Sequence, residues 1–235
     1  MNNISYTDYH RDKDYQKFES QFRNIFQKRF NIIKRFVNSG RVLDIGASTG
    51  TMIDIFAEHD YETWGVEPSE SAKVAAKKGH NIVRCFFEKV DLPENFFDLV
   101  IMNHTLEHMD DPTLVLRKVK KILRKNGVVF IDVPNFGGLG SKLLGRHWPY
   151  RLPDEHKHQF TREGLTKVLK KVGFKVIYAE SRSGIFEYAN PFREFFESLF
   201  TLKKRFFFNL ITIPYAGLAT LFDLGDSISF VVKKN

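Results

Sequence analysis

The chain has 235 residues, of which 43% are hydrophobic and 27% are charged. This balance is ordinary for a folded globular protein, so it excludes wholesale disorder, collagen-like repeats and a membrane protein with several spans. The net charge of +8 favours anionic partners, without choosing among nucleic acid, phosphorylated substrates and an acidic membrane surface.

A single cysteine, Cys85, excludes an intramolecular disulfide framework and a cysteine-rich zinc site. Residues 1–16 mix acidic and basic side chains and contain no apolar stretch of signal-peptide length. We therefore expect a cytoplasmic protein.

The first predicted element is an amphipathic helix, because apolar side chains recur at three- and four-residue steps over residues 15–37, before Gly40. Strand and helix patterns then alternate. The expected strands are 42–45, 62–66, 81–85, 98–103, 127–133, 174–180 and 227–233, and the expected helices are 51–58, 69–78, 112–124 and 162–171. This alternation predicts an α/β fold with a doubly wound, mostly parallel sheet flanked by helices, in which the strand at 227–233 closes an edge.

Two segments interrupt this alternation. Residues 135–160 are rich in glycine, proline, aromatic and histidine residues and look too irregular for a helix or strand, so we interpret them as a candidate lid. Residues 181–225 form a Phe-rich helical insert before the last strand, and residues 206–222 within it carry no charge and follow three basic residues. We expect a packed helical hairpin or a homodimer interface there, with peripheral membrane contact through residues 203–222 as the alternative.

The sharpest local signal follows the first strand, where Asp44 precedes a turn containing Gly46 and Gly50. Glycines let the backbone turn tightly from strand to helix and approach a ligand closely. The turn differs from a dinucleotide fingerprint because Ser48 stands where a second glycine would be. An ionised Asp44 would repel a pyrophosphate and attract a cationic amine.

A second acid, Glu67, ends the next predicted strand. An acid about 20 residues after the first turn can accept hydrogen bonds from both ribose hydroxyls. A ligand that satisfies both acids contains a ribose, an ammonium and a sulfonium but no phosphate. S-adenosylmethionine has these groups.

The glycine turn, the strand-end acid and the segment from Phe97 to His108 occur in this order along the chain. In this the chain resembles the class I S-adenosylmethionine-dependent methyltransferases, whose motifs have the same order. The resemblance implies a Rossmann-like methyltransferase domain over residues 41–235 after an N-terminal helical or lid segment at 1–40. It also implies that Phe86 or Phe87 flanks the adenine and that Glu88 lies near the adenine amino group. The implied cofactor-binding residues are Asp44, Gly46, Ala47, Ser48, Gly50, Glu67, Pro68, Phe87, Glu88, Asn103 and His104.

Four histidines are candidates for a general base that removes a proton from a substrate hydroxyl, because imidazole titrates near neutral pH. The candidate catalytic residues are His104, His108, His156 and His158. Each of them can instead have a capping or packing role. His156 and His158 could reach one metal ion, but the spacing identifies no third ligand, so no metal site is predicted.

The expected function is methyl transfer to an oxygen of a small-molecule, glycan or lipid-linked acceptor. Nucleic acid is disfavoured as the acceptor, because His104 and Thr105 follow Asn103 where base amino-group methyltransferases have two prolines and an aromatic residue. One alternative is a non-catalytic module that docks a membrane or protein partner through the basic, Phe-rich insert. A nicotinamide-dependent oxidoreductase is a third class, disfavoured by Asp44 and Ser48.

Overall fold

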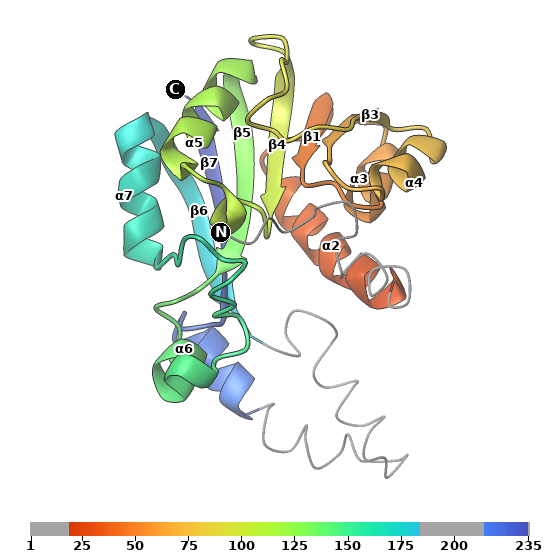
Figure 1. The fold of residues 1–235 in the computed structure, drawn as a ribbon. Coiled ribbons are helices and arrows are strands. Elements are labelled where there is room, and N and C mark those ends of the chain that lie inside the picture. The colour runs from red at the N-terminus through yellow and green to blue at the C-terminus, as the bar shows by residue number, and fades with distance from the viewer. Residues whose placement is uncertain (1–18, 184–213, 235) are drawn as a thin grey trace.

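The structure, a computed structural model, describes residues 19–183 and 214–234 and contains one seven-stranded sheet with the order β3-β2-β1-β4-β5-β7-β6 (Figure 1). The strands are β1 (Arg41–Ile45), β2 (Glu62–Val66), β3 (Asn81–Val83), β4 (Phe97–Asn103), β5 (Leu123–Pro134), β6 (Phe174–Arg182) and β7 (Ser227–Lys234). Strands β1 to β5 pair in parallel, whereas β7 is antiparallel to both of its neighbours. The predicted α/β class with a mostly parallel sheet is confirmed.

Helices cover both faces of this sheet. The helices are α2 (Glu19–Ile33), α3 (Thr51–Ala57), α4 (Ala72–Lys77), α5 (Pro112–Ile122), α6 (Leu139–Leu144) and α7 (Arg162–Val172), with single 3-10 turns η2 (Leu106–His108) and η3 (Gly145–His147). Residues 214–221 are also helical. Helices α5 and α7 pack on one face and α2 and α3 on the other, as Figure 1 shows.

Neighbouring residues of the central strands supply the two hydrophobic cores. Leu43 and Val100 join the core under α5 and α7, whereas Val42 and Leu99 join the core under α2 and α3. Successive side chains of a strand point to opposite faces, so strands covered on both sides must be apolar at nearly every position. This explains why the strands read as short continuous apolar runs in the sequence.

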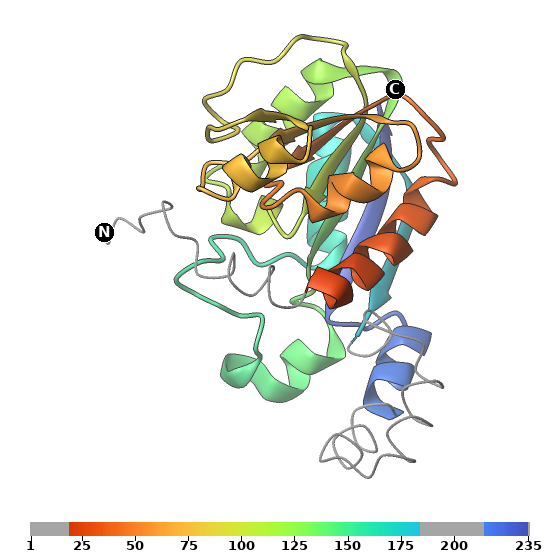
Figure 2. The same ribbon diagram turned by 90° about the vertical axis from the view of Figure 1, so that its right-hand side faces the viewer.

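Helix α2 packs into a hydrophobic core shared with α3 and the sheet. Phe30 is buried, and its ring meets that of Phe56 from α3 edge to face, with the ring centroids 5.0 Å apart. Figure 2 shows α2 running along the face of the sheet. The rest of the N-terminal segment predicted at 1–40 includes residues 1–18, which lie outside the described residues.

The prediction that the strand at 227–233 closes an edge of the sheet is wrong. Strand β7 lies between β5 and β6, and Phe230 pairs with Ile131 on one side and Ala179 on the other. Residues 227–232 are all buried, which suits an inner strand. An apolar strand pattern reveals burial, but it cannot identify the neighbours of the strand.

The insert at residues 135–160 is more regular than expected, since it contains α6 and η3. The indole Nε1 of Trp148 donates a hydrogen bond to Oδ1 of Asp226 at 3.1 Å, and Trp148 is buried. The hydroxyl of Tyr215, from the helix at 214–221, also donates to Asp226. These contacts hold the insert against Asp226, the residue that precedes β7.

The Phe-rich insert is described only in part. Residues 184–213, with the basic cluster at 203–205, lie outside the described residues, so membrane contact or dimerisation through 203–222 stays a prediction. Within the described ranges, no helix is long and apolar enough to cross a bilayer.

Candidate active site

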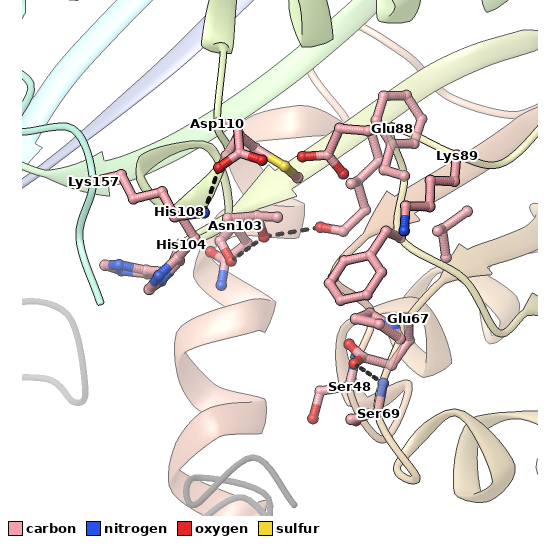
Figure 3. Close-up of a pocket in the computed structure, with 18 residues that line it drawn as sticks. Ser48, Glu67, Ser69, Glu88, Lys89, Asn103, His104, His108, Asp110 and Lys157 are labelled. Carbon is pink, nitrogen blue, oxygen red and sulfur yellow. Dashed lines mark hydrogen bonds and ion pairs between the residues drawn. The ribbon is translucent and has the colours of Figure 1, made fainter. Parts of the chain in front are cut away.

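A cavity of about 380 Å³ opens at the carboxyl ends of β1, β2 and β4. Ligands of doubly wound folds bind at this edge of the sheet, because the chain leaves β1 and β4 in opposite directions there. Figure 3 shows Glu67, Ser48 and Ser69 at one end of the cavity and His104 and His108 at the other. Of the predicted cofactor residues, Gly46, Ser48, Glu67, Pro68, Phe87, Glu88, Asn103 and His104 line it.

The turn after β1 is as tight as the sequence predicts. Gly46 has a φ of +82°, and a Cβ added there would lie 2.7 Å from Oγ1 of Thr105. Gly50 has a φ of +80° and forms the N-cap of α3, and a Cβ there would lie 3.0 Å from Cβ of Ala75. Both positions therefore require glycine, and the turn brings the backbone to the rim of the cavity.

Asp44 and Asn103 line a small hollow that shares Gly46 and Ser48 with the cavity. Ala47 also lines this hollow, whereas Gly50 lines neither space. The Oδ1 atoms of Asp44 and Asn103 are buried and accept no hydrogen bond from any described residue. Buried acceptors without donors cost free energy, so the hollow suits a ligand that carries a cation or several N–H donors.

The pKa of Asp44 reflects this environment. Burial, with the negative charge of Glu67 as a second cause, raises the pKa of Asp44 from its ordinary 3.8 to about 7. A bound cation would reverse this effect, because an opposite charge favours the ionised carboxylate.

Glu67 is held by two backbone amides at the end of β2. Its Oε2 accepts a hydrogen bond from the Ser48 amide at 2.9 Å, and its Oε1 accepts one from the Ser69 amide at 2.8 Å. Each carboxylate oxygen has a second lone pair, so Glu67 can still accept hydrogen bonds from a diol in the cavity. The sequence did not predict a role for Ser69, because its backbone amide is the donor and almost any residue type could supply that group.

The two phenylalanines after β3 have different environments. Phe87 is buried in the core, and Nζ of Lys118 lies 5.0 Å from the centre of its ring. Phe86 is 38% exposed, and its ring lines the cavity. Both side chains line the cavity, Phe86 with a partly exposed ring and Phe87 from the core.

His104 is held between two carboxylates. Its Nε2 lies 3.2 Å from Oδ1 of Asp132, and its Nδ1 lies 3.4 Å from Oε1 of Glu107. Burial opposes protonation, but the adjacent carboxylates of Asp132 and Glu107 raise the pKa of His104 to about 9. Because both ring nitrogens face carboxylates, His104 directs no lone pair at a substrate, and this geometry disfavours it as the base.

Asp132, in β5, pairs with His104 behind the cavity and was not among the predicted residues. It accepts two hydrogen bonds from the guanidinium of Arg29, at 3.2 and 3.0 Å, and one from the Ser227 hydroxyl at 2.6 Å. Burial would raise its pKa, but the charge of Arg29 and the hydrogen bond from His104 hold the pKa of Asp132 well below its usual range. A charged residue inside the otherwise apolar run at 128–133 was the sequence feature that could have indicated a buried ion pair here.

The segment after β4 forms a turn that is separate from the next helix. Residues 106–108 are the separate 3-10 turn η2, and α5 begins at Pro112, where the carboxylate of Asp111 caps the first amides. The carbonyl of Glu107 accepts a hydrogen bond from the His158 amide, which brings the end of the 135–160 insert against η2.

The structure brings two of the other candidate histidines together and separates the third. The rings of His108 and His156 meet edge to face, with centroids 4.8 Å apart, and His108 lines the cavity. Burial is the main cause that lowers the pKa of His156. His158 is directed elsewhere, since its Nε2 lies 3.2 Å from the Asp110 carbonyl and its ring stacks on Phe160.

The family follows from comparison with known sequences, in which residues 15–179 match the family described as "Methyltransferase domain". This chain is a class I S-adenosylmethionine-dependent methyltransferase. Its cofactor is S-adenosylmethionine, as the sequence predicts. The hollow at Asp44 and Asn103 fits this cofactor, because its unpartnered acceptors match an ammonium group.

Curated relatives include proteins named as methyltransferases. The methyltransferase is 28% identical over 174 residues to a ubiquinone biosynthesis O-methyltransferase of Bradyrhizobium diazoefficiens, an alignment that covers 68% of this chain and 65% of that relative. It is 26% identical over 175 residues to "Uncharacterized protein MJ1123" of Methanocaldococcus jannaschii, covering 71% of this chain and 80% of that protein.

Solved structures share the fold of this methyltransferase. A SAM-dependent methyltransferase of Archaeoglobus fulgidus superposes with a TM-score of 0.66 at 19% identity, over 96% of this chain and all of the other. Phosphoethanolamine N-methyltransferase 2 of Haemonchus contortus, solved with S-adenosyl-L-methionine, has a TM-score of 0.68 at 20% identity, over 98% of this chain and 60% of its own. The Rossmann-like fold is thereby confirmed.

Proposed function

We propose that this methyltransferase transfers the methyl group of S-adenosylmethionine to a hydroxyl oxygen of a small-molecule, glycan or lipid-linked acceptor. The main support for the way we place the cofactor is a pair of buried acceptors without hydrogen-bond partners. These are Asp44 Oδ1 and Asn103 Oδ1, which lie in one hollow beside the cavity. Methylation at oxygen is supported by His108 at the opposite end and by the relatives named ubiquinone biosynthesis O-methyltransferase.

The cofactor spans the cavity in this proposal. Its ammonium group binds Asp44 and Asn103, its ribose hydroxyls donate to Glu67, and its adenine packs on Phe86. The glycine turn approaches the methionine part of the cofactor through backbone atoms. This arrangement supplies a positive group to the buried acid and leaves the methyl group facing the end of the cavity near His108.

The reaction is an in-line displacement at the methyl carbon. The acceptor oxygen forms the new C–O bond while the C–S bond breaks, and the electron pair of that bond leaves the sulfur neutral in S-adenosylhomocysteine. The hydroxyl proton moves to a base. Most of the acceleration comes from holding oxygen, carbon and sulfur in line, and the base adds to it.

His108 is the base in this proposal. Its Nδ1 lies 2.9 Å from the Glu155 carbonyl oxygen, so Nδ1 carries the proton of the neutral ring and Nε2 keeps its lone pair. His108 lines the cavity, whereas His104 is paired with two carboxylates.

Calorimetric titration with S-adenosylmethionine tests the cofactor residues. Asp44→Asn and Glu67→Gln should each weaken binding by about tenfold or more, because a charge-assisted contact of roughly 1.5–3 kcal/mol is lost. Glu70→Gln is the matched control, since Glu70 pairs with Lys73 at the exposed surface. Unchanged affinity in both site variants would contradict the proposed orientation.

Product analysis tests the acceptor. The enzyme is incubated with methyl-labelled cofactor and separate panels of phenols, sugars and amines, and each product is identified by mass spectrometry. We expect methyl ethers from a hydroxyl panel, and His108→Asn should lower their rate of formation without changing cofactor affinity. Methylated amines in the absence of methyl ethers would overturn oxygen as the acceptor atom.

A further inference from the structure

Three side chains able to bind a metal meet beside the acceptor end of the cavity. Glu107, His108 and His156 each offer one ligand atom, and these atoms all lie within 4.8 Å of one another. We propose that they bind a divalent transition-metal ion of the zinc type, which in turn holds the acceptor oxygen. The role for the acceptor rests on the proposed function, whereas the binding of the ion does not.

The two histidines are oriented as metal ligands are. The Nδ1 of His108 lies 2.9 Å from the Glu155 carbonyl oxygen, and the Nδ1 of His156 lies 2.8 Å from the Tyr150 carbonyl oxygen. In metal sites the second ring nitrogen of a histidine usually donates to such an acceptor, which fixes the tautomer and directs the other nitrogen at the ion. Both rings therefore present Nε2 as a lone-pair donor.

Glu107 supplies the negative charge. Its side chain is only 1% exposed, and neither carboxylate oxygen accepts a hydrogen bond from the described residues. The imidazole of His104 lies near this carboxylate, with its Nδ1 3.4 Å from Oε1 of Glu107. A buried carboxylate without hydrogen bonds is costly, and a second positive charge at its other oxygen would offset that cost.

The ligand types select the class of metal. Two imidazoles and one carboxylate form the ligand set of catalytic zinc sites with an open fourth position, and also suit other first-row transition metals. Mg²⁺ prefers oxygen ligands throughout. Metal–ligand bonds are about 2.0–2.2 Å long, so small side-chain rotations must bring the three ligand atoms nearer to one another around the ion. His108 lines the cavity, so the open position of the ion can face an acceptor there (Figure 3).

The ion would change how the acceptor loses its proton. A hydroxyl bound to a divalent cation is more acidic, so its proton passes to solvent and the oxygen attacks the methyl carbon as an anion. His108 then acts as a ligand and not as the base. The charge of the sulfonium and that of the oxygen anion cancel as the C–O bond forms and the C–S bond breaks.

Metal titration of the full chain, without cofactor or acceptor, tests the site. After dialysis against a chelator and then against chelator-free buffer, Co²⁺ is added and its visible absorption is followed, and Zn²⁺ is then used as competitor. We expect one Co²⁺ per chain, displaced by Zn²⁺ and not by Mg²⁺. Absence of stoichiometric Co²⁺ and Zn²⁺ binding would overturn the proposal.

Variants locate the ion. Glu107→Gln and His156→Asn should each weaken Co²⁺ binding by about 100-fold, since loss of even an outer contact costs about 10–100-fold. His147→Asn is the matched control, because His147 is an exposed histidine in η3 outside the cluster. Thermal unfolding without metal checks that each variant folds. Equal Co²⁺ affinity in the folded Glu107→Gln and wild-type proteins would refute this ligand set.

Two further outcomes separate this inference from the proposed function. If chelated enzyme forms methyl ethers at an undiminished rate, the ion has no catalytic role and the base mechanism at His108 stands. If Co²⁺ binds as expected but no hydroxyl acceptor is methylated, the metal site stands and the proposed acceptor chemistry fails.

Discussion

The Nε2 atom of His104 lies 3.2 Å from Oδ1 of Asp132, which joins the end of β4 to β5 by an ion pair beside the cavity. Arg29 extends this contact to α2, and Glu107 extends it to η2. Positive and negative side chains therefore alternate from α2 to η2. Each charge in this row has an opposite charge as its neighbour.

Loss of the carboxylate at Asp132 should destabilise the fold strongly. Asp132→Asn leaves Arg29 and His104 without their shared counter-charge, and removing one partner of a buried pair costs about 3–5 kcal/mol. Urea unfolding at pH 7 measures this change in the free energy of unfolding. Glu58→Gln, which breaks an exposed pair with Arg23, should cost no more than about 1 kcal/mol. Equal losses in the two variants would show that the row of charges does not stabilise the protein.

The glycine turn should tolerate no side chain at Gly46. Gly46→Ala introduces a Cβ 2.7 Å from Oγ1 of Thr105 at a φ of +82°, whereas Gly79→Ala has a φ of +96° with no atom within 4 Å. Backbone strain alone should lower the free energy of unfolding of the Gly79 variant by about 1–2 kcal/mol. The Gly46 variant should lose about 1–3 kcal/mol more from overpacking, and it should also weaken cofactor binding. Chemical unfolding and calorimetry of the pair check this, and similar results for both would exclude the clash with Thr105.

Cofactor affinity should depend on pH through Asp44. Because the pKa of this acid is raised to about 7, the site is partly protonated below that pH and ionised above it. An ammonium group binds the ionised form, so affinity should rise about tenfold from pH 6 to pH 8 and then level off. Binding below pH 7 should release a proton, which calorimetry in buffers of different ionisation enthalpy detects. Asp44→Asn should bind weakly with no such pH dependence, and a pH profile equal to that of the wild type would exclude Asp44 as its source.

The 135–160 insert should loosen when Asp226 is removed. Asp226 accepts hydrogen bonds from Trp148 at 3.1 Å and from the Ser183 hydroxyl at 2.6 Å, so Asp226→Ala leaves buried donors without an acceptor. We expect faster amide hydrogen exchange across α6 and η3. Cofactor affinity should stay the same, because Trp148, Ser183 and Asp226 do not line the cavity. Unchanged exchange would mean that apolar packing of Trp148 alone holds the insert.

Much of this molecule follows from local sequence. The apolar runs predict each strand of the sheet, and the turn at Gly46 and Gly50 with Glu67 predicts the cofactor site, because strand periodicity and turn chemistry depend on neighbouring residues. In a doubly wound sheet the carboxyl ends of parallel strands share one edge, so acids at two strand ends are brought together by the fold class itself.

Other features depend on contacts between distant parts of the chain. The place of β7 inside the sheet, the pairing of His104 with Asp132, and the meeting of Glu107 with His156 all join segments far apart in sequence. His156 and His158 are close in sequence, yet only His156 reaches the cluster.

The sequence by itself determined the α/β class, the family and the two acids, Asp44 and Glu67, near the ends of neighbouring strands. The tertiary structure decided which histidine pairs with two carboxylates, which two lie beside Glu107 and which one stacks on Phe160. The physical reason is that burial and the nearest charges, which set the state of an imidazole, come from distant parts of the chain.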